Sequence, residues 1–255
     1  MTPRLLGHRG ACAEFPENTM PSFRRAVEVG VDVLETDVHR TRDGVIVVSH
    51  DPDGQRSAGV GRLIAQCTLA EVRGWDVGWG YVDASGSRPF AGQGIGMPTL
   101  EDALDAFPDQ RFNVDIKTEQ KGLVPDLLAL LEARGDSDRV TLASFFDAVI
   151  DEVRNRGFRG TTALSRKEVF ALATLPTFAC RKLIKGHFAQ IPVAAGPLKL
   201  ATRAFIKKCH RLGLLVDYWT INDVSDAHVL LERGADGIIT DDPAALRPAV
   251  ARYRG

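Results

Sequence analysis

The sequence predicts an α/β fold, a closed (β/α)8 barrel, from three observations. Short β-branched or apolar runs alternate with helix-length segments along almost the whole chain. Because a helical segment separates most successive runs, the chain crosses over between strands, and this implies that the strands pair in parallel. When the run Val45–Ser49 is set aside as a hairpin partner, eight strands remain, and eight parallel strands close a barrel.

The helical segments carry recognisable ends. In Met20–Val29 apolar residues recur at helical spacing, with Asn18 or Thr19 as a cap and Gly30 as the stop. A doubly wound open sheet would show the same alternation, but the Gly-rich turn typical of that fold does not follow the first strand. The barrel strands are expected at Arg4–Gly7, Val31–Val38, Arg111–Lys117, Val140–Ser144, Thr161–Leu164, His187–Ile191, Leu215–Thr220 and Asp236–Thr240.

One stretch interrupts this alternation. Residues 52–96 are rich in glycine and weak in strand signals, with Trp75, Trp79 and Tyr81 interspersed. Unstructured segments of this length are usually functional or lid-like. We therefore expect residues 1–255 to form one barrel domain, with 52–96 as a small insertion that follows the hairpin and covers one end of the barrel.

Composition limits the function classes. Hydrophobic residues make up 44% and charged residues 25% of the chain, and 32 basic against 33 acidic residues give a net charge of −1. This balance argues against nucleic acid as a partner. No apolar run reaches the ~20 residues of a membrane span, and no signal peptide is evident, so a cytoplasmic protein is expected. The cysteines are expected to be reduced, buried thiols: Cys12, Cys67, Cys180 and Cys209.

Acidic residues stand at the ends of two predicted strands. Residues two apart on a strand share a face, so Glu35 and Asp37 project together, as do Asp115 and Lys117. Ionised groups inside a barrel are costly unless they are paired or bind a metal ion. Three carboxylates offer only oxygen ligands, which suit one hard divalent cation, Mg²⁺ or Ca²⁺. The alternative is a set of structural salt bridges that includes Asp115–Lys117.

Two histidines also stand at strand ends. His8 is followed by Arg9, and His50 is followed by Asp51. In phosphodiester cleavage one histidine can take a proton from the nucleophile while the other gives a proton to the leaving oxygen. Arg9 suits bidentate binding of phosphate oxygens, and Lys117 can add a point charge there. The remaining histidines are interpreted as structural or exposed: His39, His187, His210 and His228.

Ordered motifs along the chain resemble those of the glycerophosphodiester phosphodiesterase family. The segment from His8 to Thr19, H-R-G-A-x-x-x-x-P-E-N-T, is similar to its opening motif. The later motifs follow in the family's order and span essentially the whole chain: Glu35-Thr36-Asp37-Val38, Val48-Ser49-His50-Asp51, Met97-Pro98-Thr99-Leu100-Glu101, Val114-Asp115-Ile116-Lys117, Tyr218-Trp219-Thr220-Ile221-Asn222 and Asp236-Gly237-Ile238-Ile239-Thr240-Asp241.

The resemblance implies a TIM barrel and a metal-dependent phosphodiesterase that hydrolyses glycerophosphodiesters to glycerol 3-phosphate and an alcohol. Trp219 would pack against the alcohol, although a place in the barrel core explains it nearly as well. The chain departs from the family at Asp115, where glutamate is usual. Glu17 and Asn18 lie near the family's site, and helix capping explains them at least as well here. The implied roles are acid/base catalysis for His8 and His50, metal binding for Glu35, Asp37 and Asp115, and phosphate binding for Arg9 and Lys117.

Within the hydrolase prediction, attack by water and attack by the substrate's own neighbouring hydroxyl through a cyclic phosphate both stay open. Three alternatives to that prediction also stay open. The first is a lysophospholipase D that acts on lysolipids, since the apolar stretch Phe170–Cys180 and the basic residues after it could touch a membrane. That stretch is otherwise an outer barrel helix, broken at Pro176. The second is a non-catalytic protein that binds a phosphate ligand. The third is a phosphatidylinositol-specific phospholipase C, which shares the two-histidine chemistry but lacks the P-E-N-T and W-T-x-N motifs.

Overall fold

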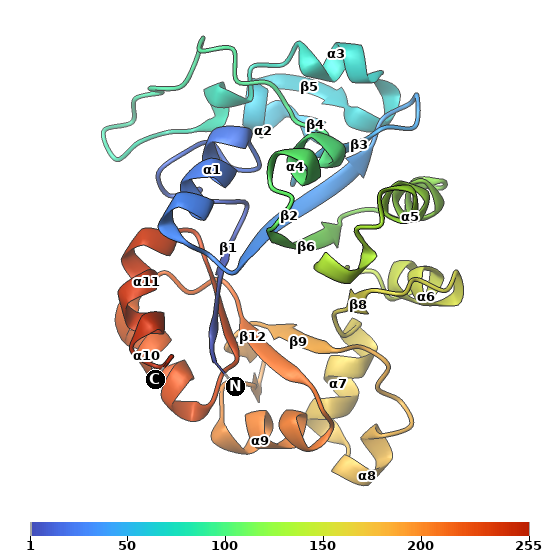
Figure 1. Cartoon of the computed structure of the whole chain (residues 1–255), viewed down its shortest axis with the longest axis vertical. Helices are drawn as coiled ribbons and strands as arrows, with labels where there is room; N and C mark the ends of the chain where they lie inside the picture. The colour runs from blue at the N-terminus through green and yellow to red at the C-terminus, as the bar shows by residue number, and fades with distance from the viewer. Residues whose placement is uncertain (1, 255) are drawn as a thin grey trace.

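The computed structural model describes residues 2–254 and confirms the (β/α)8 barrel (Figure 1). Eight parallel strands follow one another around the barrel in chain order. An isolated bridge between Ala163 and Phe188 joins the fifth strand to the sixth. The strands are β1 (Arg4–Gly7), β2 (Val33–Arg40), β6 (Arg111–Ile116), β7 (Val140–Ala143), β8 (Thr161–Thr162), β9 (Phe188–Ile191), β12 (Leu215–Tyr218) and β13 (Gly237–Thr240).

The strand positions agree with those expected, while several ends differ. Strand β2 runs two residues further than predicted, to Arg40, because the hairpin strand β3 (Ile46–Val48) pairs with its last three residues in antiparallel register. Strand β8 keeps only two of its four expected residues, although the Leu164 amide still donates to the carbonyl of Phe188.

Each barrel strand leads to an outer helix. Helix α1 has the predicted bounds: the Thr19 hydroxyl accepts from the Ser22 amide, and Gly30 ends the helix at φ 88°. The bounds are α1 (Met20–Val29), α4 (Leu100–Ala106), α5 (Leu123–Arg134), α6 (Asp147–Asn155), α7 (Arg166–Thr174), α9 (Arg203–Arg211), α10 (Val224–Arg233) and α11 (Pro243–Ala251), with a short 3-10 helix η3 (Ser137–Arg139) before β7.

Strand alternation places the acidic residues inside the barrel. Leu34 and Val38 of β2 pack outward into the core beneath the helices, so Glu35 and Asp37 point to the opposite face. The parallel register of β2 and β6 sets Asp37 directly beside Asp115. The buried carboxyl groups of neighbouring strands thus meet at one level of the barrel.

A polar network fills the barrel interior around Asp217, which has no exposed surface. An Arg4 Nη2 donates to the Asp217 carboxylate over 2.5 Å, and Gln190 Nε2 donates to Asn113 Oδ1 over 2.9 Å. Gln190 also reaches Asp217 at 3.4 Å. A buried charge needs such partners because its hydration is lost.

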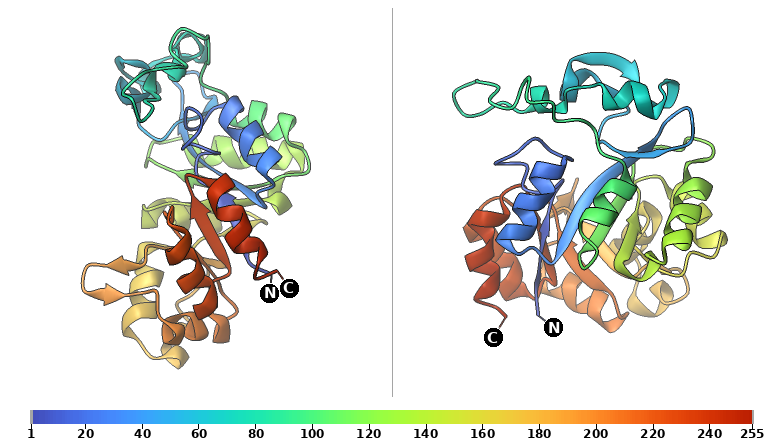
Figure 2. Two further views of the ribbon diagram at one scale, coloured as in Figure 1. Left: turned by 90° about the vertical axis from the view of Figure 1, so that its left-hand side faces the viewer. Right: turned by 45° about the horizontal axis from the view of Figure 1, so that its top comes forward.

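Residues 52–96 form short elements beside the barrel rather than an unstructured loop (Figures 1 and 2). They have their own small core, in which Ile64, Val72 and Trp75 pack with Met97. The two strands pair antiparallel, a sheet that the weak strand signals did not predict. The elements are β4 (Asp53–Gly54), α2 (Gln55–Ala58), β5 (Val60–Leu63), η1 (Ile64–Gln66), α3 (Leu69–Arg73) and η2 (Val77–Gly80).

Further short elements lie between β8 and α9. As predicted, Pro176 breaks the helical stretch, which divides into α7 and α8 (Thr177–Cys180). The hairpin of β10 (Ala194–Ala195) and β11 (Leu198–Lys199), which the sequence did not predict, projects from the barrel (Figure 2). Among residues 2–254, we find no helix whose length and apolar character would let it cross a membrane.

We predict that Arg4→Met lowers the free energy of unfolding by about 3 kcal/mol, because the buried Asp217 carboxylate would lose its cationic partner. Urea denaturation measures this loss. Arg42→Met is the control: its partner Glu71 lies 3.6 Å away and the Arg42 side chain is 61% exposed, so a loss below about 1 kcal/mol is expected. Equal losses in the two variants would contradict a stabilising role for the interior ion pair.

Candidate active site

A cavity of about 1040 Å³ opens at the carboxyl ends of the barrel strands. This is the end at which barrel enzymes carry their active sites. Asp37 lies beneath the cavity wall, fully buried. The other residues predicted from the sequence all line the cavity: His8, Arg9, Glu35, His50, Asp115, Lys117 and Trp219. The structure therefore brings the whole predicted set together, while the roles of its members stay predictions.

The carboxylates form an ion-pair cluster with Lys117. Its ammonium lies 2.6 Å from Asp115 Oδ2 and 2.9 Å from Asp37 Oδ1. The contact with Asp37 lacks hydrogen-bond geometry, so Asp37 Oδ1 has no donor among residues 2–254, and neither has Asp115 Oδ1. The predicted salt bridge Asp115–Lys117 is thus present, yet it leaves Asp115 Oδ1 without a donor, while Asp37 Oδ1 has only the ion-pair contact with Lys117.

Electrostatics within the cluster are unbalanced, because three carboxyl groups face two cations. Burial, followed by the charge of Asp37, raises the pKa of Glu35 to about 7. Burial would also raise the pKa of Asp37, but the charges of Lys117 and Arg9 outweigh it and hold that pKa below its ordinary value. Burial raises the pKa of Asp115. The site therefore has capacity for further positive charge.

The donor set fits a divalent cation. Glu35, Asp37 and Asp115 offer oxygen ligands alone, and the two oxygens without donors are the kind that a hard cation satisfies. The three carboxylates do not bring oxygens within 4.8 Å of one another here, and the Lys117 ammonium lies between Asp37 and Asp115. An ion at this place would take over the neutralising role that Lys117 has in this arrangement.

Arg9 lies at the rim of the cluster in an unusual backbone conformation, with φ 54°. Its amide donates to Glu35 Oε2 over 3.0 Å, and its guanidinium contacts both Glu17 oxygens at 3.1 Å. Its Nε lies 3.2 Å from Asp37 without making a hydrogen bond. The guanidinium retains donor capacity beside the cavity, as phosphate binding requires.

Both predicted catalytic histidines are held by carboxylates. His8 Nδ1 lies 2.6 Å from Asp241 Oδ1, and His50 Nδ1 lies 2.7 Å from Asp51 Oδ1. A carboxylate on Nδ1 orients the ring and leaves Nε2 for other chemistry. Burial alone would lower the pKa of His8, but Glu35 and the hydrogen bond to Asp241 outweigh it, so the pKa is raised.

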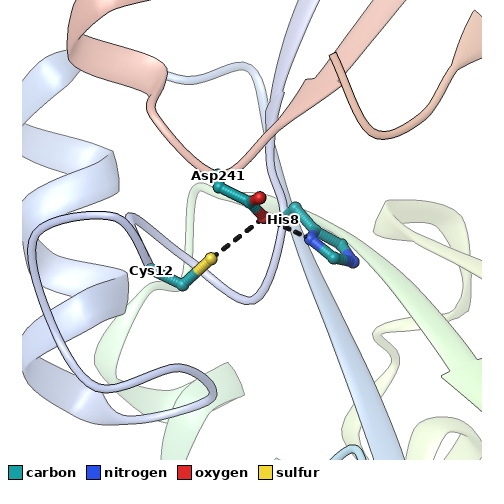
Figure 3. A group of neighbouring side chains, drawn as sticks. All are labelled: His8, Cys12 and Asp241. Atoms are coloured by element: carbon teal, nitrogen blue, oxygen red, sulfur yellow. Dashed lines mark hydrogen bonds and ion pairs between the residues drawn. The ribbon is translucent and has the colours of Figure 1, made fainter. Parts of the chain in front are cut away.

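Asp241 also accepts a hydrogen bond from Cys12 Sγ over 3.1 Å (Figure 3). The ligand atoms of His8, Cys12 and Asp241 lie within 4.8 Å of one another, a spacing that could hold a metal ion. Burial, with the neighbouring Asp241 charge, raises the pKa of Cys12 far above its ordinary value, so in this arrangement the protonated thiol donates to Asp241. We interpret the group as a hydrogen-bonded support for His8.

Sequence reasoning undervalued Glu17 and Asn18, because helix capping explained them equally well. The structure shows that Thr19 caps α1, while the Asn18 amide donates to Asp37 Oδ2 over 2.9 Å. Asn18 also accepts from the Thr36 hydroxyl. The Glu17 carboxylate accepts a hydrogen bond from the Arg9 guanidinium. The capping interpretation is therefore wrong for both residues, whose side chains support the site.

The insertion contributes Arg56, which sequence reasoning missed. Its guanidinium donates to both oxygens of Glu17, over 2.6 and 2.9 Å, and to Asp51 Oδ2 over 2.6 Å. Arg56 of α2 thus links Glu17, which contacts Arg9, to Asp51, which contacts His50. The sequence holds no signal for Arg56, since its partners lie in separate segments, whereas Asp51 and Asp241 already stood in the quoted motifs.

The part of the cavity lined by Trp219, α7 and the β10–β11 hairpin, here called the apolar half, carries mainly apolar side chains, together with Arg166 and Lys167 of α7. Trp219 lies at its wall, edge to face with Phe145 at 5.7 Å between ring centroids, rather than in a sealed core. Helix α7 and the β10–β11 hairpin complete this wall with Val169, Phe170 and Leu198. The cavity therefore joins a charged end, suited to phosphate, to an apolar end.

The other four histidines lie in structural contacts. His39 Nε2 lies 3.1 Å from the carbonyl oxygen of His50, and His187 Nδ1 accepts from the Thr162 amide. His210 pairs with Asp236, and His228 contacts the Tyr253 hydroxyl. None of these histidines lines the cavity.

Comparison with known proteins identifies the chain's relatives. The model of the glycerophosphoryl diester phosphodiesterase family matches residues 8–245. The chain belongs to this family. This excludes the phospholipase C alternative, and the chain is a phosphodiester hydrolase of a family that generally depends on a divalent metal ion.

Individual phosphodiesterases are similar over nearly their whole length. "Probable glycerophosphodiester phosphodiesterase 2" of Mycobacterium tuberculosis is 31% identical over 253 residues, covering 95% of this chain and 88% of that protein. Lysophospholipase D GDPD1 of Rattus norvegicus is 26% identical, covering 96% and 85%. The crystal structure of glycerophosphodiester phosphodiesterase from Agrobacterium tumefaciens superposes with a TM-score of 0.80 at 18% identity, covering 98% and 99%, and supports the fold.

We predict that Asp241→Asn lowers kcat about 100-fold, because the support that orients His8 would lose its charge. The Asp241 hydrogen bond helps to raise the pKa of His8, so the inflection that belongs to His8 should move to lower pH in this phosphodiesterase. A pH profile of kcat tests both effects.

Asp242→Asn is the matched control. Asp242 caps α11 through the Ala245 amide, and asparagine caps as well as aspartate does. Its activity and pH profile should match those of the unaltered protein. If Asp241→Asn retained both the rate and the inflection, the positioning role of Asp241 would be refuted.

Proposed function

We propose that this protein hydrolyses glycerophosphodiesters to glycerol 3-phosphate and an alcohol. The observation that carries the proposal is the pair of carboxylate-held histidines, His8 and His50, which line one cavity together with Arg9, Lys117 and the acidic cluster. A phosphodiester placed there meets two groups able to transfer protons and two permanent cations.

The carboxylates Glu35, Asp37 and Asp115 would hold one divalent cation, Mg²⁺ or Ca²⁺. The support for this is the all-oxygen donor set and the two buried oxygens without donors. When bound, the cation supplies positive charge that stabilises the negative charge growing on the phosphate oxygens. Asp115 is shorter than the glutamate usual in the family, which leaves it the ligand most open to bridging by water.

The chain's own residues supply binding and proton transfer. Arg9 and Lys117 neutralise the phosphate, and the flexible Lys117 stem allows its ammonium to turn from the carboxylates toward the substrate. One histidine takes a proton from the attacking water through Nε2, and the other gives a proton to the departing alcohol oxygen. Trp219 and Phe145 form the wall beside that alcohol.

The apolar half of the cavity favours a second candidate, hydrolysis of lysolipids as by a lysophospholipase D. An acyl chain could lie along Val169, Phe170 and Leu198, and each buried methylene contributes about 0.8 kcal/mol. We expect the water-soluble diester to be at least as good a substrate. A lysophosphatidylcholine preference of about tenfold, equal to about 1.4 kcal/mol of transition-state binding, that Phe170→Ser abolished would favour the lysolipid instead.

We predict that the purified protein releases glycerol 3-phosphate from glycerophosphocholine with Mg²⁺ or Ca²⁺, and that chelation abolishes this activity, because the acidic cluster would lose its cation. Asp115→Glu should stay partly active, while Asp115→Asn should bind metal at least tenfold more weakly in calorimetry. Asp109→Asn, on the exposed turn before β6, is the control. Full activity after exhaustive chelation would refute the three-carboxylate site.

We also predict that His8→Ala and His50→Ala each lower kcat by roughly 10²–10⁴-fold, since each removes a positioned acid or base. The thermal midpoint should change little in both, because both side chains line an open cavity. The double variant should lose much less than the product of the single losses. A substrate with a good leaving group should rescue only the variant that lacks the acid, whereas a single variant with near-normal turnover would remove that histidine from the mechanism.

A further inference from the structure

The net charge of −1 conceals a strong asymmetry. Residues 161–215, here called the basic segment, hold ten Lys or Arg residues and one acidic residue, Glu168, which leaves 22 basic and 32 acidic residues in the rest of the chain. Glu168 is buried and paired with Arg154, so it does not offset the surface charge. Nine of the ten cations are exposed: Arg166, Lys167, Arg181, Lys182, Lys185, Lys199, Arg203, Lys207 and Arg211.

The same segment exposes large apolar side chains. Phe178 of α8 is 78% exposed and Phe170 of α7 is 63% exposed. Among residues 2–254, five of the eleven exposed large apolar side chains lie here, although the segment is about a fifth of the chain: Phe170, Leu175, Phe178, Leu183 and Val193. Apolar side chains gathered on one surface within a ring of charge mark an interaction site.

The elements of the basic segment lie together in space. Helices α7, α8 and α9 form the end of the molecule opposite the insertion in Figure 1. The Lys208 ammonium of α9 donates to the carbonyls of Leu172 and Leu175, which ties α9 to the end of α7. Arg181 and Lys182 follow α8 directly and make no ion pair with any residue in 2–254. Their charge is available to a partner.

We propose that the surface of α7, α8 and α9 docks on an anionic lipid membrane. Its cations complement acidic headgroups, and each Lys or Arg near such a surface adds attraction. Phe178 and Leu183 lie beside Arg181 and Lys182, so apolar side chains can enter the headgroup region while the cations remain at the phosphates. Nucleic acid would use the cations alone and would leave these apolar side chains in water.

The docking surface meets the cavity. Lys167 and Phe170 of α7 and Leu198 of the β10–β11 hairpin line the cavity and also belong to the basic segment. A membrane against α7 and α8 would therefore lie beside the apolar half of the cavity. The docking itself needs no catalytic residue and is tested without turnover.

The test is sedimentation of the full chain with vesicles, with chelator present so that no diester is consumed. We expect binding to vesicles of equal parts phosphatidylserine and phosphatidylcholine, and little binding to phosphatidylcholine alone. Arg181→Gln with Lys182→Gln should weaken binding about 25-fold, at about fivefold for each charge. Phe178→Ser with Leu183→Ser should weaken it roughly tenfold, because the apolar contribution is lost. High salt should release the protein by screening the charges.

Matched controls remove the same groups from other faces. Arg24→Gln with Arg252→Gln removes two exposed cations, and Val82→Ser with Val229→Ser removes two apolar side chains that are 49% and 42% exposed. These variants should bind vesicles as the unaltered chain does, and all variants should retain hydrolysis of glycerophosphocholine in solution.

Three results would overturn the proposal. One is the absence of binding to the anionic vesicles, and another is an equal loss of binding in the control variants. The third is a partner of another class: single-stranded DNA that binds while vesicles do not, or a dimer in sedimentation velocity that Phe178→Ser with Leu183→Ser dissociates.

Discussion

The burial of three like charges near the carboxyl end of the barrel is the constraint on which the site depends. Glu35, Asp37 and Asp115 lie on neighbouring strands with almost no exposure to water. Carboxylates in such a place must be neutralised by cations, protonated, or both. Lys117 and Arg9 supply part of that charge, and the raised pKa of Glu35 reflects the remainder. The divalent cation proposed for this cluster would offset the same imbalance.

Around this cluster, a second layer of carboxylates acts on the histidines and on Arg9. Asp241 holds His8, Asp51 holds His50, and Arg56 of the insertion joins Asp51 to Glu17. The residues of this layer come from both ends of the chain and from the insertion. Closure of the barrel between β1 and β13 makes it possible, because their pairing sets Gly7 opposite Thr240 and so brings the residues that follow them together.

The cavity has two chemical halves, and each continues into a different part of the molecule. The charged half is linked to the insertion through Arg56, which contacts Glu17 and Asp51. The apolar half is bounded by α7 and the β10–β11 hairpin, which belong to the strongly basic segment. The two proposals for this phosphodiesterase, phosphate chemistry and membrane docking, therefore concern neighbouring parts of one cavity.

The sequence by itself determined the fold class, the eight strands and the predicted members of the site, because strand alternation and strand ends are local properties. Glu35 and Asp37 share a face through spacing alone. The sequence did not predict several strand ends, the β4–β5 sheet or the β10–β11 hairpin, because these depend on which strands pair in the folded chain. Only the tertiary structure decided that Asn18 serves Asp37 and that Asp241 serves His8, because these contacts join residues 19 and 233 positions apart. The first depends on the pairing of β1 with β2, and the second on the closure of the barrel between β1 and β13.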